Sequence, residues 1–397
     1  MTQLKLTRRH FLYLAGLGTA GTLLACGDEE SPDPENPDPP KELWVYVGTY
    51  TTGQESQGIY LCRLDLETGV LQQVGVTPGV ADPSFLAVDG KRRYLYAVNE
   101  LTSFEGKPSG AVSAFTIHPE THALTFINQQ ATQGGAPCHL EVDAKDGFVL
   151  VANYVGGNVA VLPIQEGGGL GPTVEVKQHE GSGPNTDRQE GPHAHQVRLD
   201  ATQKYAFVSD LGTDKIMVYQ FDAGRGKLTP HQPASVATQP GAGPRHLTFH
   251  PNGRFAFNIN ELNSTLTAFA YDSAQGTLTP LQTVPALPEG FTGASYCADI
   301  HVSPDGRFLY GSNRGHDSIV VYAIGPSGQL TYVEHVSTLG RWPRNFTIDS
   351  TGTYLLVANQ HTHSIVTFRR DAETGKLTPV GQPLEIPAPV CLLLVPA

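Results

Sequence analysis

A unit that recurs every 46 to 57 residues constrains the fold of this chain more than any other feature. Each copy starts with proline or a small residue, continues through alternating apolar positions and a turn, and ends in an apolar segment closed by Asn or Asp. The copies span residues 83–100, 137–154, 193–211, 244–261, 297–314 and 343–360, and their closing residues are Asn99, Asn153, Asp210, Asn260, Asn313 and Asn359. Repetition at this period is typical of solenoids and propellers.

Within each copy the pattern indicates a β-hairpin followed by two more strands. Apolar alternation with a period of two leads into turns such as SPDG (303–306) and then into a second strand. A third segment follows, such as SIVVYAI (318–324), and a fourth follows after its own turn, such as GQLTYVEHV (328–336). Four short strands per repeat predict an all-β propeller, with each repeat forming one four-stranded blade.

The two ends of the repeat region supply a seventh blade. Residues 387–397 match the first strand of the unit and then stop, whereas residues 43–50 match the second strand and have no first strand before them. We therefore expect the N-terminal strand to join the C-terminal blade and remove the open sheet edge. This predicts one seven-bladed domain over residues 43–397 with no long amphipathic helix, and each closing Asn is interpreted as a hydrogen-bonding device of its blade.

The first residues have the pattern of an export signal. Basic residues precede an apolar stretch of residues 11–25 that is short for a membrane span, and Arg8 and Arg9 resemble a twin-arginine pair. Residues 23–26 (LLAC) resemble a bacterial lipoprotein box, which would make Cys26 the lipidated residue. We expect a signal peptide at 1–25, an acidic proline-rich tether at 26–42, and a lipid-anchored protein facing the periplasm or cell exterior of a bacterium. The alternative is an uncleaved anchor helix.

Charge excludes several classes of partner. The chain has 26 basic and 38 acidic residues, a net charge of −12, so no broad basic face is present for nucleic acid. We expect membrane contact only through the lipidated N-terminus, and a monomer. Any anion-binding site must be local and built from a few arginines. Four further cysteines (Cys62, Cys138, Cys297 and Cys391) are widely spaced without a CxxC motif, which favours buried free thiols over disulfides.

Polar residues that break the repeat mark a candidate site. When the first strands of the copies are aligned, two adjacent positions carry polar and charged side chains, among them His195, Arg245, His246, Asp299 and Arg344. The residue after the closing Asn also varies, giving Glu100, Glu261 and Arg314. An arginine in an inward-facing position requires a partner, so three arginines at one rim would bind a carboxylate or phosphate. The alternative is that each forms a structural ion pair with Glu100, Glu261 or Asp299.

The segment 188–197 (RQEGPHAHQV) departs most from the repeat. It contains Arg188, Glu190, His193 and His195, and a neutral histidine here would serve as a general base. The H-x-H spacing of His193 and His195, like that of His361 and His363, is also found in metal sites, but neither pair has evident further ligands. The sequence has no GxSxG motif and no P-loop. We therefore expect no metal and no cofactor.

Several motifs resemble the lactonase family of seven-bladed propellers, which includes propeller-type 6-phosphogluconolactonases and the fungal carboxy-muconate cyclising enzyme. The residues that carry the resemblance are YVGTYT (46–51), GIYLCRLD (58–65), GPNTDRQEGPHAH (183–195), GAGPRHLTFHPNGRF (241–255), NELNST (260–265), LPEGF (287–291), ADIHVSPDGRFLY (298–310), NRGHDSI (313–319) and PRNF (343–346). The resemblance implies hydrolysis or formation of a lactone ring. It places the family's polar site on His193, Arg245, Glu261 and Arg314, with His195 as the alternate base and Arg344 as a further anion contact.

These residues lead to a working hypothesis. His193 would take a proton from water that attacks a lactone carbonyl, Arg245 and Arg314 would hold the substrate anion and the oxyanion, and Glu261 would orient an arginine or histidine. Glu100, His246 and Asp299 are further candidates for substrate contact. The ligand would be a lactone or sugar acid. An exported protein would not meet the family's phosphorylated cytoplasmic substrate, which leaves the substrate open. The competing hypotheses are a non-catalytic, lipid-tethered binding propeller and a lactone-forming cyclase.

Overall fold

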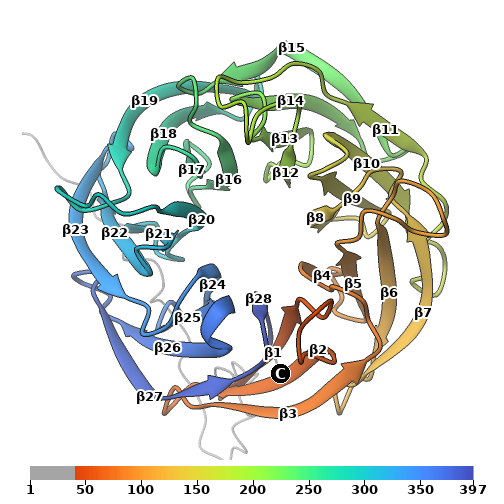
Figure 1. Cartoon of the computed structure of the whole chain (residues 1–397), viewed down its shortest axis with the longest axis horizontal. Coiled ribbons are helices and arrows are strands. Elements are labelled where there is room, and N and C mark those ends of the chain that lie inside the picture. The colour runs from red at the N-terminus through yellow and green to blue at the C-terminus, as the bar shows by residue number, and fades with distance from the viewer. Residues whose placement is uncertain (1–40, 397) are drawn as a thin grey trace, which may run out of the picture. The chain divides into compact units, whose positions relative to one another are not determined.

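The computed structural model describes residues 41–396, which form seven four-stranded antiparallel sheets around a central axis (Figure 1). The predicted signal peptide, Cys26 and residues 26–40 of the predicted tether lie outside the described residues. No helix within 41–396 is long and apolar enough to cross a membrane. The one helical element there is a 3₁₀ turn, η1 (Gln360–Thr362), which agrees with the prediction of an all-β fold.

The first three blades follow the predicted repeat. Blade 1 contains β28 (Pro389–Pro396), β1 (Glu42–Thr49), β2 (Gly58–Asp65) and β3 (Leu71–Pro78). Blade 2 contains β4 (Leu86–Val88), β5 (Tyr94–Asn99), β6 (Ala111–Ile117) and β7 (Leu124–Ala131). Blade 3 contains β8 (Pro137–Val142), β9 (Phe148–Asn153), β10 (Asn158–Pro163) and β11 (Glu175–Gln178).

The remaining blades have the same strand order from the axis outward. Blade 4 contains β12 (Ala194–Leu199), β13 (Tyr205–Asp210), β14 (Lys215–Asp222) and β15 (Lys227–Ala237), and blade 5 contains β16 (Pro244–Phe249), β17 (Phe255–Asn260), β18 (Thr265–Asp272) and β19 (Thr277–Pro285). Blade 6 contains β20 (Tyr296–Val302), β21 (Phe308–Arg314), β22 (Ser318–Ile324) and β23 (Leu330–Ser337), and blade 7 contains β24 (Pro343–Ile348), β25 (Tyr354–Asn359), β26 (Ser364–Arg370) and β27 (Leu377–Glu385).

The ring closes inside blade 1, as the incomplete repeats at the two ends predict. β1 pairs with β28 from Leu43 opposite Pro396 to Thr49 opposite Pro389, and it pairs with β2 on its other side. β1 is fully flanked, and its residues Val45, Tyr46 and Val47 are completely buried. The ring is therefore closed within blade 1, where the first described strand pairs with the last.

The hydrophobic core lies between neighbouring blades. Apolar residues on facing sides of two sheets interdigitate, as where Phe257 and Leu266 of blade 5 meet Ile300 and Leu309 of blade 6. This arrangement explains why the middle strands read as nearly continuous apolar runs, since both of their faces are covered. Each blade buries its apolar faces only against its neighbours, which explains why the same unit is repeated around the ring.

In blades 2, 6 and 7 the closing Asn of the repeat ties the blade to the loop that arrives from the previous one. Asn99 Nδ2 donates to Ala81 O (2.7 Å), Asn313 Nδ2 to Ala286 O (2.7 Å) and Asn359 Nδ2 to Thr338 O (3.0 Å). All three side chains are buried. The prediction that these residues are structural hydrogen-bonding groups is confirmed for these blades.

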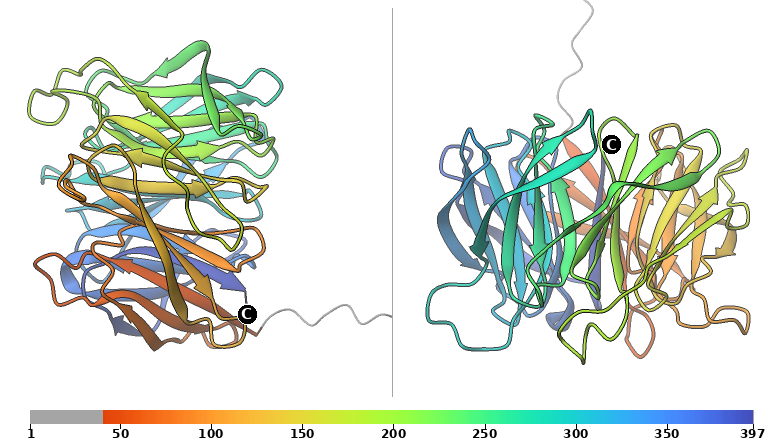
Figure 2. Two further views of the ribbon diagram at one scale, coloured as in Figure 1. Left: turned by 90° about the vertical axis from the view of Figure 1, so that its right-hand side faces the viewer. Right: turned by 90° about the horizontal axis from the view of Figure 1, so that it is seen from above.

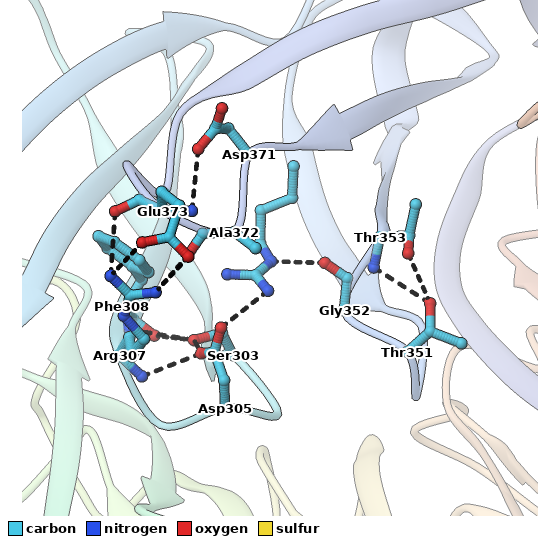
Figure 3. A network of polar contacts seen from close by, with 12 residues as sticks. Ser303, Asp305, Arg307, Phe308, Thr351, Gly352, Thr353, Asp371, Ala372 and Glu373 are labelled. Atoms are coloured by element: carbon cyan, nitrogen blue, oxygen red, sulfur yellow. Dashed lines mark hydrogen bonds and ion pairs between the residues drawn. The ribbon is translucent and has the colours of Figure 1, made fainter.

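A second set of contacts links blades 6 and 7 on the face that carries the first hairpin turns (Figure 3). Arg370, at the end of β26, is buried and donates from Nε to Gly352 O and from Nη2 to Asp305 Oδ2 (2.9 Å). Arg307 reaches from blade 6 to the carbonyl oxygen of Ala372 (3.0 Å) and to the Glu373 carboxylate. We call this face the lower face and the opposite one the upper face; Figure 2 shows the loops gathered on the two faces of the ring.

Candidate active site at the upper mouth of the channel

Bulges in the inner strands bring two adjacent residues to the channel. In a regular strand neighbours point to opposite sides. The register shifts at the second residue of β8, β12, β16 and β24, so that Cys138, His195, Arg245 and Arg344 have no opposite partner. A bulge re-aims a side chain in this way and is frequent beside active sites. Both predicted polar positions of each strand therefore face the axis.

These bulged residues, together with Ser84, form a neck that divides the channel. Ser84, Cys138, His195, Arg245 and Arg344 surround a space of about 10 Å³, which holds at most one water molecule. Below the neck the channel widens into a lower chamber of about 470 Å³ that extends toward the lower face. A substrate approaching from the upper face would stop at the neck.

Glu261 holds three arginines at the upper side of the neck. Its Oε1 lies 2.6 Å from Nη2 of Arg188, and its Oε2 lies 3.1 Å from Nε of Arg245 and 2.8 Å from Nη2 of Arg314. Burial raises the pKa of the Glu261 carboxyl, but the charges of Arg314, Arg245 and Arg188 outweigh it and lower the pKa to about 2. One negative charge is thus shared by three positive ones.

Arg245 and Arg314 are committed to this cluster. Both are buried, with Arg245 2% and Arg314 5% exposed. Arg245 also donates to Ala298 O, and Arg314 donates to Tyr296 O and Cys297 O at 3.2 Å each. The alternative that these arginines form ion pairs is therefore observed with Glu261, and neither pairs with Asp299.

Arg344 is held more loosely. Within the described residues its guanidinium makes no hydrogen bond, and its Nη2 lies 3.9 Å from Oε1 of Glu100. Glu100 is in turn fixed by hydrogen bonds from the hydroxyl groups of Ser84 and Tyr50. Arg344 lies 5.4 Å from the centre of the Tyr50 ring. It therefore presents N–H donors at the neck that no protein acceptor occupies.

His193 lies at the mouth with both ring nitrogens in contact. Its Nδ1 is 3.0 Å from Tyr154 O and its Nε2 is 3.1 Å from Oε1 of Glu190, a carboxylate that is 62% exposed. The imidazole stacks on the Tyr154 ring at 4.5 Å. Its backbone N–H donates to the buried Asp210 (2.9 Å). Both ring nitrogens of His193 therefore face oxygen acceptors, one on the backbone and one on an exposed carboxylate.

His195 occupies the neck and has different surroundings. Burial and then the charges of Arg245, His246, Arg344 and Arg314 hold the pKa of its imidazole well below the ordinary value. Its Nδ1 is buried with no hydrogen-bond partner in the described part of the chain. His195 is therefore a neutral imidazole that resists taking a proton.

His246 and Asp299 lie one layer below the bulged residues. His246 Nδ1 is 2.8 Å from Oδ1 of Asp299, whose Oδ2 contacts His301 and accepts from Asn345 Nδ2 (2.6 Å). Burial and Arg245 lower the pKa of His246 to about 4, so the imidazole is neutral and donates to an ionised Asp299. The structure does not place either residue with Glu261, although the sequence suggested both as substrate contacts.

This lower layer connects neighbouring blades. Gln196 Oε1 accepts from Leu247 N (2.6 Å) and Asn345 Oδ1 accepts from Leu392 N (2.7 Å), each across to the next inner strand. Inner strands are sheet edges whose backbone groups would otherwise lack partners in a narrow channel. The polar residues of this layer therefore satisfy strand edges.

Aromatic rings frame the arginines at the mouth. The Trp342 ring lies 5.4 Å from the Arg314 guanidinium and stacks on His361 at 4.8 Å. Trp342 has a φ of 66°, a conformation that is costly for a bulky residue and is held here by a hydrogen bond from its backbone N–H to Asp317 (2.8 Å). Tyr296 lies beside it at 6.1 Å. Rings around charged donors suit the recognition of a polar molecule with an apolar face.

Sequence reasoning did not select Arg188, Tyr154 or Trp342 as site residues. Arg188 was visible in the non-repeating loop beside His193, and its charge was the only signal for it. Tyr154 occupies the variable position after a closing Asn, equivalent to Glu261 and Arg314, and this position could have identified it. Between residues 41 and 396, no three His, Cys, Asp or Glu side chains are arranged to hold a metal ion, and the four cysteines are buried and free.

Comparisons with known proteins agree with this architecture. A family model described as "Lactonase, 7-bladed beta-propeller" matches residues 44–394. A 6-phosphogluconolactonase of Bacillus subtilis is 40% identical over 348 residues, which cover 87% of this chain and 97% of the relative. A 6-phosphogluconolactonase of Formosa agariphila is 36% identical over 86% of this chain and 96% of its own length. The solved periplasmic gluconolactonase of Pseudomonas aeruginosa is 35% identical, with a TM-score of 0.84 and coverage of 89% and 99%.

Proposed function

The chain belongs to the lactonase family of seven-bladed β-propellers, and from that premise we propose that it is a lactone hydrolase, similar to 6-phosphogluconolactonase, that opens a sugar lactone with water. The observation that carries the proposal is the cluster at the upper mouth. There, a histidine with a carboxylate neighbour lies beside arginines that exceed their acidic partners in number. Such a site supplies a proton acceptor and stabilises a developing oxyanion.

His193 fits the role of general base better than His195. A base must gain a proton in the transition state, and the charged group beside the His193 ring is a carboxylate, that of Glu190. His195 faces Arg245 and Arg344 in the neck, and their positive charges oppose the same step. With Nδ1–H donating to the Tyr154 carbonyl, Nε2 is the nitrogen that takes the proton, once the exposed Glu190 side chain has turned away and admits water to it.

The reaction then runs in two steps. His193 Nε2 takes a proton from water as the water oxygen bonds to the lactone carbonyl carbon, and the carbonyl oxygen becomes an oxyanion that faces the unoccupied N–H donors of Arg344. The oxyanion then re-forms the carbonyl, the bond from this carbon to the ring oxygen breaks, and the ring oxygen takes the proton back from His193. The product is the open hydroxy acid, and the histidine is neutral again.

We extend the proposal to the location of the protein. The twin-arginine pattern and the lipoprotein box at Cys26 support export and lipid anchoring of a propeller that the 26–42 segment would hold off the membrane. A relative of similar architecture is a periplasmic gluconolactonase, which supports a site of action outside the cytoplasm. In that case the substrate would be a sugar lactone present outside the inner membrane.

Ring opening followed by NMR against the spontaneous rate tests the function. We expect the protein to accelerate the opening of at least one sugar lactone, and His193→Ala to lower kcat by about 10²- to 10⁴-fold, the usual contribution of a positioned base. His195→Ala serves as the matched control in the same segment and should retain more activity. Full activity of His193→Ala would exclude this base, and no acceleration of any lactone would favour a binding propeller.

A further inference from the structure

The arginines at the mouth differ in how many of their nitrogens the protein already uses. Arg245 and Arg314 each donate from two of three guanidinium nitrogens, to Glu261 and to backbone carbonyls, and both are buried. Arg188 donates only from Nη2, to Oε1 of Glu261 (2.6 Å) and to the Tyr154 hydroxyl (3.2 Å). Its Nε and Nη1 make no hydrogen bond within the described residues.

Arg188 is also the most accessible of the group. Its side chain is 36% exposed, against 6% or less for Arg314 and Arg245. The guanidinium lies 6.0 Å from the centre of the Tyr296 ring, and Arg188 is not among the residues that line the neck. A molecule that enters the mouth can therefore reach Arg188 without displacing the rest of the cluster.

The backbone that carries Arg188 is fixed. The next residue, Gln189, is fully buried and donates from Nε2 to Leu211 O (2.8 Å) and to Asp214 Oδ1 (2.7 Å). Its backbone N–H and that of Arg188 both donate to Asn185 O. The segment around Arg188 is thus anchored to blade 4, and a movement of the guanidinium needs only side-chain rotation.

Moving Arg188 away from Glu261 would leave that carboxylate paired. Arg245 and Arg314 both contact Oε2, whereas Arg188 contacts Oε1. With one carboxylate and three guanidinium groups, the cluster carries an excess of two positive charges. An anion at the mouth would be attracted by this excess and would give Arg188 a second partner.

We propose that Arg188 is a specificity-determining residue, which binds an anionic substituent of the lactone, a phosphate or a carboxylate remote from the ring ester, and makes the enzyme prefer charged over neutral sugar lactones. The inference rests on the proposed function. Arg344 at the neck faces the reacting carbonyl, whereas Arg188 at the outer rim faces the other end of the substrate. A planar guanidinium with free N–H groups suits bidentate binding of either anion.

The test compares three lactones of one sugar type: glucono-δ-lactone, which is neutral, 6-phosphogluconolactone, and a glucarolactone that carries a carboxylate. We expect Arg188→Gln to lower kcat/KM about 10- to 100-fold for the anionic lactone that the enzyme prefers, mainly through KM, and to change the neutral lactone less than threefold. Arg188→Lys should recover part of the loss. The phosphate and carboxylate arms identify which anion the arginine binds.

Arg254→Gln is the control. Arg254 is an exposed arginine in the lower-face turn between β16 and β17, so this substitution removes the same charge far from the mouth. An equal loss on neutral and anionic lactones, or no loss on the anionic ones, would overturn the proposal, as would a wild-type preference for the neutral lactone. If the wild type opens none of the three, the proposed function fails. Calorimetric binding of 6-phosphogluconate and gluconate then decides alone: a preference for the phosphorylated acid that disappears in Arg188→Gln supports the role of Arg188, and its persistence contradicts it.

Discussion

Glu261 is the residue on which the charge balance of the mouth depends. It is 4% exposed and contacts Arg188, Arg245 and Arg314, so it neutralises part of a positive charge that would otherwise be buried without a partner. Removing one member of a buried ionic cluster is costly because the remaining charges stay desolvated. Glu261 is therefore a structural requirement as well as a candidate catalytic residue.

This role gives the stability of the protein a defined pH dependence. The pKa of Glu261 is about 2 in the folded chain, below its ordinary value of 4.5, so the unfolded state takes up the proton first as the pH falls. The stabilisation is complete above about pH 5 and is lost as the pH falls toward 2. We expect Glu261→Gln to cost about 3–5 kcal/mol at pH 7.

Urea denaturation at a series of pH values measures this effect. The difference in the free energy of unfolding between wild type and Glu261→Gln should shrink as the pH falls from 5 toward 2. Glu261→Asp keeps the charge and should show a smaller loss at pH 7. A difference that stays constant over this range would show that the carboxylate does not carry the predicted proton linkage.

The bulges of the inner strands are the elements that build the site. They are the reason why His195 and Arg245 enter the neck, whereas Asp299 lies in the layer below, paired with His246, which borders both the neck and the lower chamber. The repeat pattern was enough to predict the blades, the closure and the two polar positions. It could not separate the two layers, because a register shift leaves no mark in residue type.

Blade 4 differs from the other five complete copies of the repeat at its closing residue. Asp210 stands where Asn closes the other copies, and its carboxylate accepts from the backbone N–H of His193 (2.9 Å) and of Thr213 (3.1 Å) and contacts His179 Nδ1. The alignment of the repeats within the chain showed that Asp210 is an exception, but it did not explain why. The structure explains it as a local anchor for the loop that carries the proposed base.

Asp210→Asn should loosen this anchor while keeping the fold. The amide retains one acceptor oxygen but loses the charge that His179 and the two N–H groups share, so we expect a loss of about 1–3 kcal/mol and a drop in kcat of about tenfold. Asn359→Ala is the control at the equivalent position of blade 7 and should cost about 1 kcal/mol without affecting kcat. Equal kcat values in Asp210→Asn and wild type would show that the anchor does not position His193.

On the scale of the whole molecule, the first and the last described strands along the chain belong to the same blade. Leu43 of β1 lies opposite Pro396 of β28, so residues 42 and 396 are close in space. The incomplete repeats at the two ends predicted this pairing, because neither end can form a blade alone. The loop that carries Arg188 does not follow the repeat. Its position at the upper mouth could be determined only from the structure.

This closure predicts opposite outcomes for two rearrangements. A circular permutant that links residue 396 to residue 42 and opens the chain in the exposed turn around Lys91 preserves every strand pair, so its melting temperature should stay within a few degrees of wild type. Deletion of residues 389–397 exposes the edge of β1 and should give an insoluble or unfolded product. Circular dichroism melting of both proteins makes the comparison, and a well-folded deletion variant would contradict the closing role of β28.

The shared blade also sets the order in which the protein can become complete. During synthesis, β1 leaves the ribosome before the other described strands, but its inner partner β28 is the last of these strands to be made. Six blades can be assembled while the ring is still open, and the chain must then bring together segments that are farthest apart along its length, a slow kind of contact to form. A truncated translation product would therefore keep an unpaired strand edge, and such a product would be recognisable to chaperones and proteases as unfinished.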